Sequence, residues 1–334
     1  MTSVALSQAY QAARTHAALL ERRRGRIVVS GRDRATYLQG LLTNDIPALK
    51  EGHGCYAAYL TPQGRMISDV LIYELGDVIL LSLPMATKDV VLSKLDQFIF
   101  SEDVQLGDVT DTFAGVAVVG PDASVLVNAL VGPDVATLAC LPVHGNLRGT
   151  VSGQPVIVLR VDDTGEPGFE LLVPAEALAD IRTVLLDAGA VDADETTAEQ
   201  LRIEAGVARF GQDMDEETIP LEAGIEAKAI SFTKGCYVGQ EVIIRVLHRG
   251  HGRVARKLVG LTFGPSGAVP APGTVLLADG RDVGSITSST FSPTCGRPIA
   301  LGYVKRDFIE PGTAVTAAGG GVAQVVVLPF VART

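Results

Sequence analysis

The stretch Lys234-Gly235-Cys236-Tyr237-Val238-Gly239-Gln240-Glu241 gathers a cation, a thiol, two glycines and an amide–acid pair. The glycines near Cys236 allow the backbone to adopt positive φ or to approach a ligand closely. Lys234 lies close in sequence to the sulfur, and the run 240–247 fits a short helix, whose N-terminus would favour the thiolate further, or a strand. The stretch indicates a site with a reactive thiol. The alternative is that Cys236 is a small buried apolar residue, as free cysteines usually are.

Beyond this stretch the pattern changes to short apolar segments separated by Gly and Pro. Such spacing predicts a small all-β barrel or sandwich that begins at about residue 250. The expected strands are residues 257–263, 273–277, 283–289, 299–304 and 322–328.

Before the stretch, strands alternate with helices without the regular spacing of a doubly wound sheet, so the α+β class is expected. The 334 residues exceed the size at which one core keeps growing. We expect an α+β region over residues 1–250, made of two subdomains with a break near 115–150, and a β-barrel domain over 251–334. Helices are predicted at residues 7–22, 32–42, 88–100, 121–131, 174–188 and 198–208, and strands at 26–30, 55–60, 65–75, 77–83, 115–120, 156–161 and 168–173.

Composition excludes several classes of partner and site. The net charge of −10 opposes binding to DNA and to anionic membranes, and RNA is not expected. The N-terminal segment lacks a signal-peptide core, and the longest apolar runs are too short to span a bilayer. The four cysteines form no C-x-x-C pair, so no metal site is predicted, and reduced thiols fit a cytoplasmic protein.

A basic segment follows the opening stretch. Between Arg245 and Lys257 the chain carries five basic side chains and no acid: Arg245, Arg249, Arg253, Arg256 and Lys257. The segment is either a solvated linker or a clamp for a phosphate or a polyanionic tail, such as the polyglutamate of a folate.

Three further motifs carry a family resemblance. Leu201-Arg202-Ile203-Glu204-Ala205-Gly206, Gly211-Gln212-Asp213 and Pro220-Leu221-Glu222-Ala223-Gly224 resemble the tetrahydrofolate-binding segment of the glycine-cleavage T-protein superfamily. Ser292-Pro293-Thr294 and the run 299–304 are similar to its C-terminal barrel, so the resemblance covers nearly the whole chain. Within that superfamily K-G-C-Y-x-G-Q-E marks the YgfZ-type branch, which is implicated in folate-dependent iron–sulfur cluster assembly or repair.

The resemblance implies a folate site. The turn Leu42-Thr43-Asn44-Asp45 matches a T-N-D turn near the folate, although by itself it is a simple helix-terminating turn. Glu204 matches the acid that binds the pterin, and a carboxylate can accept two parallel N–H bonds there. Its other interpretation is a solvated helix acid. The implied folate contacts are Asn44, Asp45, Tyr56, Asp69, Glu204, Gln240 and Arg245.

The chain also departs from the family pattern. Where aminomethyltransferases carry an adjacent Asp pair, it has Ser68-Asp69, and their Gly-Arg-Glu is here Gly239-Gln240-Glu241. The first hypothesis is therefore a tetrahydrofolate-binding accessory protein for iron–sulfur client or assembly proteins, with Cys236, Lys234 and Asp69 as the chemically active groups. The alternatives are a folate-dependent aminomethyl or one-carbon transferase and a binding scaffold without turnover.

Overall fold

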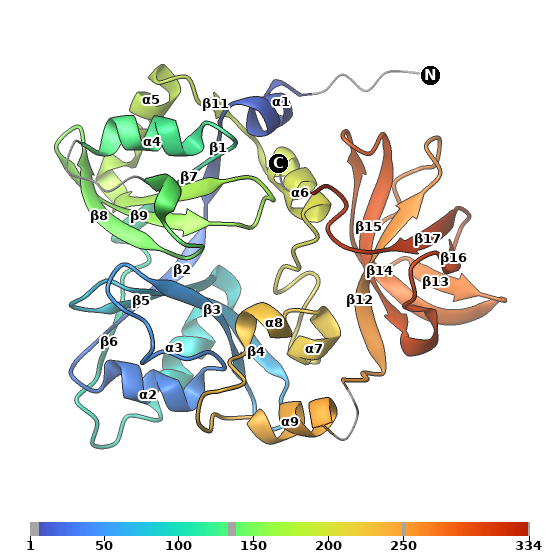
Figure 1. Ribbon diagram of the computed structural model, residues 1–334, viewed down its shortest axis with the longest axis horizontal. Helices are drawn as coiled ribbons and strands as arrows, with labels where there is room; N and C mark the ends of the chain where they lie inside the picture. The colour runs from blue at the N-terminus through green and yellow to red at the C-terminus, as the bar shows by residue number, and fades with distance from the viewer. Residues whose placement is uncertain (1–6, 133–137, 249–251, 333–334) are drawn as a thin grey trace.

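The computed structural model describes residues 7–132, 138–248 and 252–332. Figure 1 shows three bodies around a common centre: two sheets with their helices, one above the other on the left, and a β-barrel on the right. Three helices lie between these bodies: α6 (Glu195–Glu204), α7 (Pro220–Ala223) and α8 (Glu226–Ala229).

The lower sheet has five strands and two helices on its outer face. Its spatial order is β3 (Gly54–Leu60), β4 (Met66–Glu74), β5 (Ile79–Pro84), β2 (Arg24–Ser30) and β6 (Gln105–Asp108), with α2 (Arg34–Leu41) and α3 (Lys88–Asp96). The β3–β4 hairpin has the predicted turn over residues 61–64, in which Gly64 takes a φ of +75°. Only glycine adopts that conformation without steric cost.

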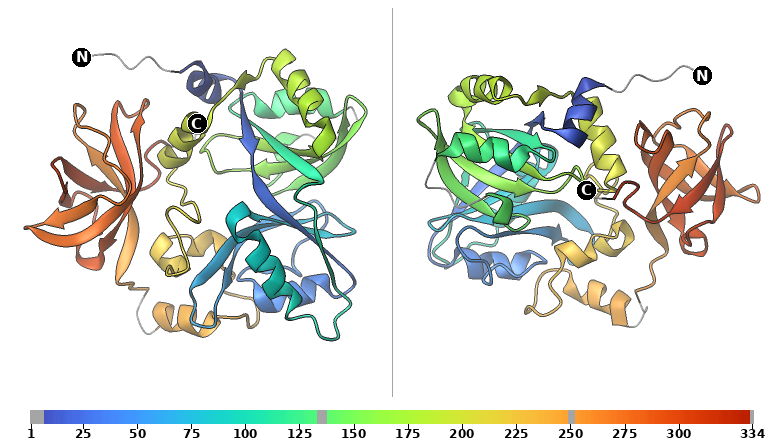
Figure 2. Two further views of the ribbon diagram at one scale, coloured as in Figure 1. Left: turned by 180° about the vertical axis from the view of Figure 1, so that it is seen from behind. Right: turned by 45° about the horizontal axis from the view of Figure 1, so that its top comes forward.

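The upper sheet has six strands and carries three further helices. Its spatial order is β11 (Val191–Asp192), β1 (Ala18–Arg22), β7 (Phe113–Val119), β10 (Gly168–Pro174), β9 (Gln154–Val161) and β8 (Asn146–Val151), with α1 (Gln8–Thr15), α4 (Ala123–Val131) and α5 (Leu178–Asp187). The predicted helix over residues 7–22 is therefore wrong beyond Thr15. Leu19 and Leu20 are both buried in a strand that pairs with β7, and Figure 2 shows this strand continuing into the lower sheet as β2.

The two sheets pack face to face through a shared apolar core. Tyr73 and Leu80 of the lower sheet contact Leu172 of the upper sheet. Beside this core, Arg26 on β2 forms a buried ion pair with Glu170 on β10, with 3.0 Å between the guanidinium nitrogen and the carboxylate oxygen. The relative position of the two sheets is thus fixed by both apolar packing and a buried charge pair.

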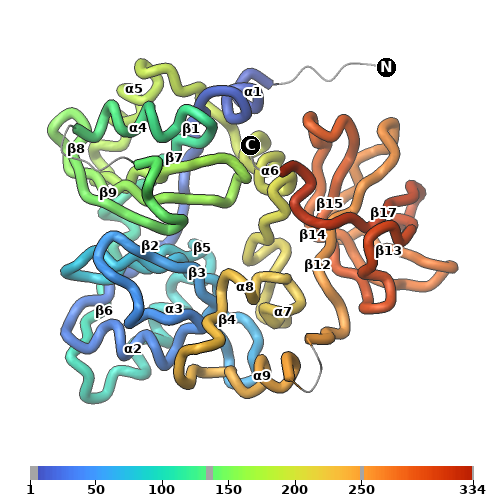
Figure 3. Tube along the Cα trace, viewed as in Figure 1, coloured from blue at the N-terminus to red at the C-terminus, as the bar shows by residue number. Residues whose placement is uncertain are grey.

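The C-terminal body is a closed six-stranded barrel, which confirms the predicted barrel and the multi-domain α+β fold class. The strands, in spatial order, are β12 (Arg256–Phe263), β15 (Arg297–Lys305), β14 (Arg281–Ser292), β13 (Val275–Ala278), β16 (Ala314–Ala317) and β17 (Val322–Val326). The predicted domain limits stay a prediction. In Figure 3 the chain leaves the barrel after β17 and returns to α6.

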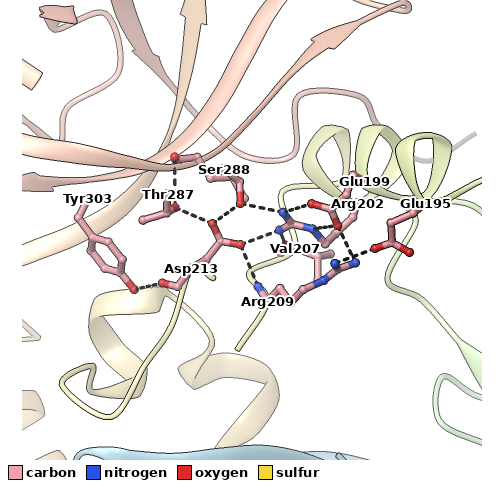
Figure 4. A network of polar contacts seen from close by, with 10 residues as sticks. Glu195, Glu199, Arg202, Val207, Arg209, Asp213, Thr287, Ser288 and Tyr303 are labelled. Carbon is pink, nitrogen blue, oxygen red and sulfur yellow. Dashed lines mark hydrogen bonds and ion pairs between the residues drawn. The ribbon is translucent and has the colours of Figure 1, made fainter. Parts of the chain in front are cut away.

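A buried polar network docks the barrel onto the segment that follows α6 (Figure 4). Asp213, only 2% exposed, accepts hydrogen bonds from Arg202 at 2.7 Å and from the hydroxyls of Thr287 and Ser288 on β14 at 2.5 and 2.6 Å. Its backbone carbonyl accepts a bond from Tyr303 on β15.

Among the described residues no helix is long and apolar enough to cross a bilayer.

Candidate functional site

A cavity of about 560 Å³, called the central cavity below, lies where loops of the upper sheet meet α8 and the C-terminal tail. Its volume falls within the range of about 300–1,000 Å³ that small-molecule sites occupy. The lining residues are Val143, His144, Asp162, Gly165, Ala205, Val207, Lys228, Pro329 and Val331.

Asp69 on β4 does not line this cavity but is linked to its lining through Tyr56, and it has an unused hydrogen-bond acceptor. Its Oδ2 accepts a bond from the hydroxyl of Tyr56 at 3.0 Å, whereas its buried Oδ1 has no partner among the described residues. Asp162 of the cavity lining is close enough for its charge to act on Tyr56. A buried carboxylate oxygen is costly to leave without a donor, so the geometry fits a ligand that supplies an N–H or O–H group.

Arg24 on β2 provides a positive charge that acts on this carboxylate. Its guanidinium donates two hydrogen bonds to Ser82, each at 2.9 Å, which fixes its position. Burial raises the pKa of Asp69, and the charge of Arg24 opposes that shift. Asp69 is therefore a stronger base than an ordinary aspartate, which suits a group that accepts a hydrogen bond or a proton from a ligand.

The residue before Asp69 faces the opposite side of the sheet. Ser68 is fully buried, and its hydroxyl lies 2.7 Å from that of Thr87. Adjacent residues of a strand point to opposite faces, so only one member of an acidic pair at these positions could lie on the side of Tyr56. The serine at position 68 therefore leaves the face of β4 that carries Asp69 unchanged.

The predicted T-N-D turn forms hydrogen bonds with the backbone of Tyr56 and of α8. The Asn44 amide donates to the carbonyls of Tyr56 at 2.8 Å and Lys228 at 3.1 Å, and Thr43 donates to Ala229 on α8. Asp45 accepts a bond from Gln39. The turn thus joins β3 to α8, and the polar groups of Asn44 and Asp45 are used within the chain.

Glu204 is neither a solvated helix acid nor free to contact a ligand, because its carboxylate is used within the protein. Its carboxylate is fully buried and accepts hydrogen bonds from Tyr10 at 2.6 and 2.9 Å, and also from Arg14 and Ser292. Its backbone carbonyl accepts a bond from the amide of Phe330 in the C-terminal tail. Glu204 therefore holds α1, α6, the barrel and the tail together, and this geometry favours a structural role over the expected pterin contact.

Replacing Glu204→Gln separates these two roles. We expect the free energy of unfolding to fall by about 1.5–3 kcal/mol, because hydrogen bonds between charged groups are lost in a buried place. Folate affinity should not change. Urea unfolding and calorimetric titration of the same variant measure both quantities, and weaker folate binding with unchanged stability would restore the pterin role.

The stretch 234–241 forms a loop that packs on the outside of the lower sheet and ends in α9 (Gln240–His248). Lys234 donates to the backbone carbonyls of Gln39, Leu42 and Asn44 at 2.6–2.8 Å, so it caps the end of α2. Burial lowers the pKa of Lys234 to about 8. The ammonium is therefore directed at carbonyl groups rather than at the neighbouring thiol.

Glycine packing fixes the second half of this loop. A Cβ on Gly239 would lie 2.5 Å from the carbonyl oxygen of Thr61, and one on Gly64 would lie 2.9 Å from Cβ of Val242. The loop therefore sits on the β3–β4 turn only because both positions are glycine. Cys236 is exposed on this loop, outside the residues that line the cavity.

The other two expected contacts lie on α9. Gln240 is its first residue, and Arg245 is exposed in its last turn. Neither belongs to the lining of the cavity. Of the basic segment, Arg249 lies outside the described residues. The structure thus brings together Asp69, Tyr56 and Asn44, and places Cys236 and α9 elsewhere.

Sequence reasoning missed four polar residues at or beside the cavity: Arg24, His144, Asp162 and Lys228. Asp162 and Lys228 form an ion pair at 3.3 Å between segments distant in sequence. Of these four residues, only Asp162 could have been suggested by its position in the sequence. It lies in the loop that follows β9, and loops at strand ends often carry functional residues.

Comparison with known proteins agrees with this arrangement. Residues 2–234 match the profile of the GCVT N-terminal domain, and residues 256–331 match that of the glycine cleavage T-protein C-terminal barrel domain. The chain therefore belongs to the glycine cleavage T-protein family.

Several relatives that match nearly the whole chain are named aminomethyltransferase. An aminomethyltransferase of Rubrobacter xylanophilus is 36% identical over 327 residues, which span 97% of this chain and 86% of that protein. One from Bacillus subtilis is 30% identical over 318 residues, 93% of this chain and 85% of that protein. The fold is also that of the glycine cleavage system aminomethyltransferase T from Bartonella henselae, with a TM-score of 0.87 at 24% identity, over 98% of this chain and 89% of that one.

Proposed function

We propose that this protein binds tetrahydrofolate in the central cavity and transfers a one-carbon unit, of the aminomethyl type, to or from it. The observation that carries the proposal is the buried Oδ1 of Asp69, which lacks a partner among the described residues and is oriented by Tyr56. A folate N–H would complete its hydrogen bonding. The family membership and the relatives named aminomethyltransferase support the same reading.

The roles of the residues follow from their positions. Tetrahydrofolate, when bound, supplies a nitrogen that carries the one-carbon unit. Asp69 accepts the N–H of that ligand at Oδ1 and, because burial raises its pKa, is suited to hold the proton during transfer. Tyr56 keeps the carboxylate in one orientation, and Asn44 fixes the backbone of Tyr56. Arg24 limits the cost of the buried negative charge.

The proposed transfer is tested by following the labelled one-carbon unit from its donor to the folate. The protein is incubated with tetrahydrofolate and an isotopically labelled aminomethyl donor, either carrier-bound or a small amine, and label on the folate is counted. We expect folate-dependent transfer that is lost in Asp69→Asn. Folate binding without any transfer would leave the protein a binding protein and remove the enzymatic part of the proposal.

A second candidate function is support of iron–sulfur clients, as in the YgfZ-type branch. One observation favours it: Cys236 is an exposed thiol on a loop held in place by the Lys234 contacts and the packing of Gly239. A thiolate can hold sulfur or iron for a short time, and an exposed position allows a client or assembly protein to reach it. Stable cluster binding would need ligands from another chain.

Replacing Cys236→Ala and Cys236→Ser distinguishes the two functions. Because the side chain is exposed, both variants should keep their free energy of unfolding within about 0.5 kcal/mol and should bind folate normally. If the thiol serves iron–sulfur clients, neither variant restores iron–sulfur enzyme activity in cells that lack such a factor, whereas one-carbon transfer persists. Full restoration by Cys236→Ala would exclude the thiol from the function.

A further inference from the structure

His144 is the histidine of the cavity lining, and its position is tightly held. Its backbone N–H donates to the carbonyl of Arg160 on β9 at 3.2 Å, and the amide of Arg160 donates back to Gly145 at 2.8 Å. On the other side, a Cβ on Gly54 would lie only 2.5 Å from the carbonyl oxygen of His144. The backbone of His144 is thus held between a strand of each sheet.

The backbone of His144 is in a conformation that side chains rarely adopt. Its φ is +63°, and only two other non-glycine residues of the described chain, Ser152 and Asp279, have positive φ. Residues held in this region often cluster at ligand sites, where the surroundings impose the conformation. Neither Ser152 nor Asp279 lines the cavity, so His144 alone of the three combines this backbone with a place in it.

The imidazole also has an unused polar atom. Its Nδ1 is buried and has no hydrogen-bond partner among the described residues. Burial lowers the pKa of His144, and the charges that act on the ring are Asp162, Lys228 and Asp163. Burial therefore favours the neutral ring, in which Nδ1 offers either an N–H donor or a lone pair, depending on the tautomer. In both cases a residue of the cavity lining holds a buried polar atom that has no partner among the described residues.

We propose that His144 is a ligand-binding residue of the central cavity, whose Nδ1 forms a hydrogen bond with a polar group of the bound molecule. The inference rests on the proposed function in taking that molecule to be a reduced folate, which carries both N–H donors and carbonyl acceptors. His144 and Asp69 then contact the ligand from different elements, the loop before β8 and strand β4. The strained backbone of residue 144 serves to direct the ring into the cavity.

The test uses two substitutions that fit the left-handed backbone equally well. Glycine adopts positive φ freely, and asparagine is among the side chains that tolerate it best. His144→Gly removes the polar group, whereas His144→Asn places an amide, which can donate or accept, near the position of Nδ1. Melting temperature and calorimetric titration with folinic acid are measured on the full chain for both variants and the wild type.

The inference predicts that both variants melt close to the wild type. His144→Gly should bind folinic acid at least about fivefold more weakly, because a polar group of the ligand is left without a partner. His144→Asn should retain most of the affinity. Wild-type affinity in His144→Gly, or an equal loss in both variants, would overturn the inference and leave folate binding intact. No binding by the wild type would instead overturn the proposed function as well as this inference.

Discussion

Replacing Asp69→Asn is expected to weaken tetrahydrofolate binding by about 1.5–3 kcal/mol, a factor of roughly 10 to 150, which is the usual contribution of a hydrogen bond to a charged group. The substitution keeps the shape of the side chain and can keep the bond from Tyr56, because one amide oxygen remains. It removes the acceptor at the position of Oδ1 and places an N–H₂ there, which would meet the N–H of the ligand. Calorimetric titration at neutral pH gives the change directly.

The same substitution should not destabilise the protein. Burial raises the pKa of Asp69 in the folded state above its unfolded value, so the folded protein binds more protons between the two values. The contribution of Asp69 to stability therefore falls as the pH rises through that window and is restored on acidification. The melting temperature of Asp69→Asn should equal or exceed that of the wild type at pH 7, and the difference should shrink as the pH approaches 4.

Ser68→Ala is the matched control. Ser68 is the neighbour of Asp69 in sequence but faces Thr87 on the other side of the sheet. Its loss should lower stability by about 1 kcal/mol through a lost buried hydrogen bond and leave folate affinity unchanged. An unchanged affinity in Asp69→Asn, or an equal loss in Ser68→Ala, would show that the carboxylate does not contact the folate.

The largest loss of stability is expected from Asp213→Ala. Asp213 accepts bonds from Arg202, which is itself buried, and from the β14 hydroxyls of the barrel (Figure 4). Removing one partner of a buried ion pair typically costs about 3–5 kcal/mol, and the cost here should lie near the lower value because Arg202 keeps its ion pair with Glu199 at 2.8 Å. The cost should appear as a lower urea midpoint.

A surface ion pair provides the comparison. Arg182 and Asp192 lie 2.5 Å apart with side chains 33% and 53% exposed. Arg182→Ala should therefore cost less than about 1 kcal/mol. If Asp213→Ala costs no more than Arg182→Ala, the network is not what docks the barrel.

The elements that depend on local pattern could be predicted from the sequence. The Gly- and Pro-separated strands of the barrel and the β3–β4 hairpin follow from spacing and turn chemistry, although the strand β16 was not predicted. The predicted helix over residues 88–100 is too long, because α3 ends at Asp96 and Phe98 lies beyond it, 44% exposed. Helix ends depend on local capping that periodicity does not reveal.

The environment of the site could not be predicted in the same way. Glu204 meets Tyr10 from 194 positions away and Ser292 from 88 positions away, so only the folded chain reveals that its carboxylate is fully used. The sequence placed Lys234 beside Cys236, but the loop directs the ammonium to the end of α2. Asp69, in contrast, was found through the family motif, and its unused oxygen adds a physical reason for its role.

Calorimetric titration of the wild-type protein with tetrahydrofolate tests the central claim most directly. The cavity volume and its few polar anchors predict a dissociation constant in the micromolar range, about −8 kcal/mol, with competition by folinic acid. The absence of both heat and competition, in a protein shown to be folded, would contradict a folate site in the central cavity.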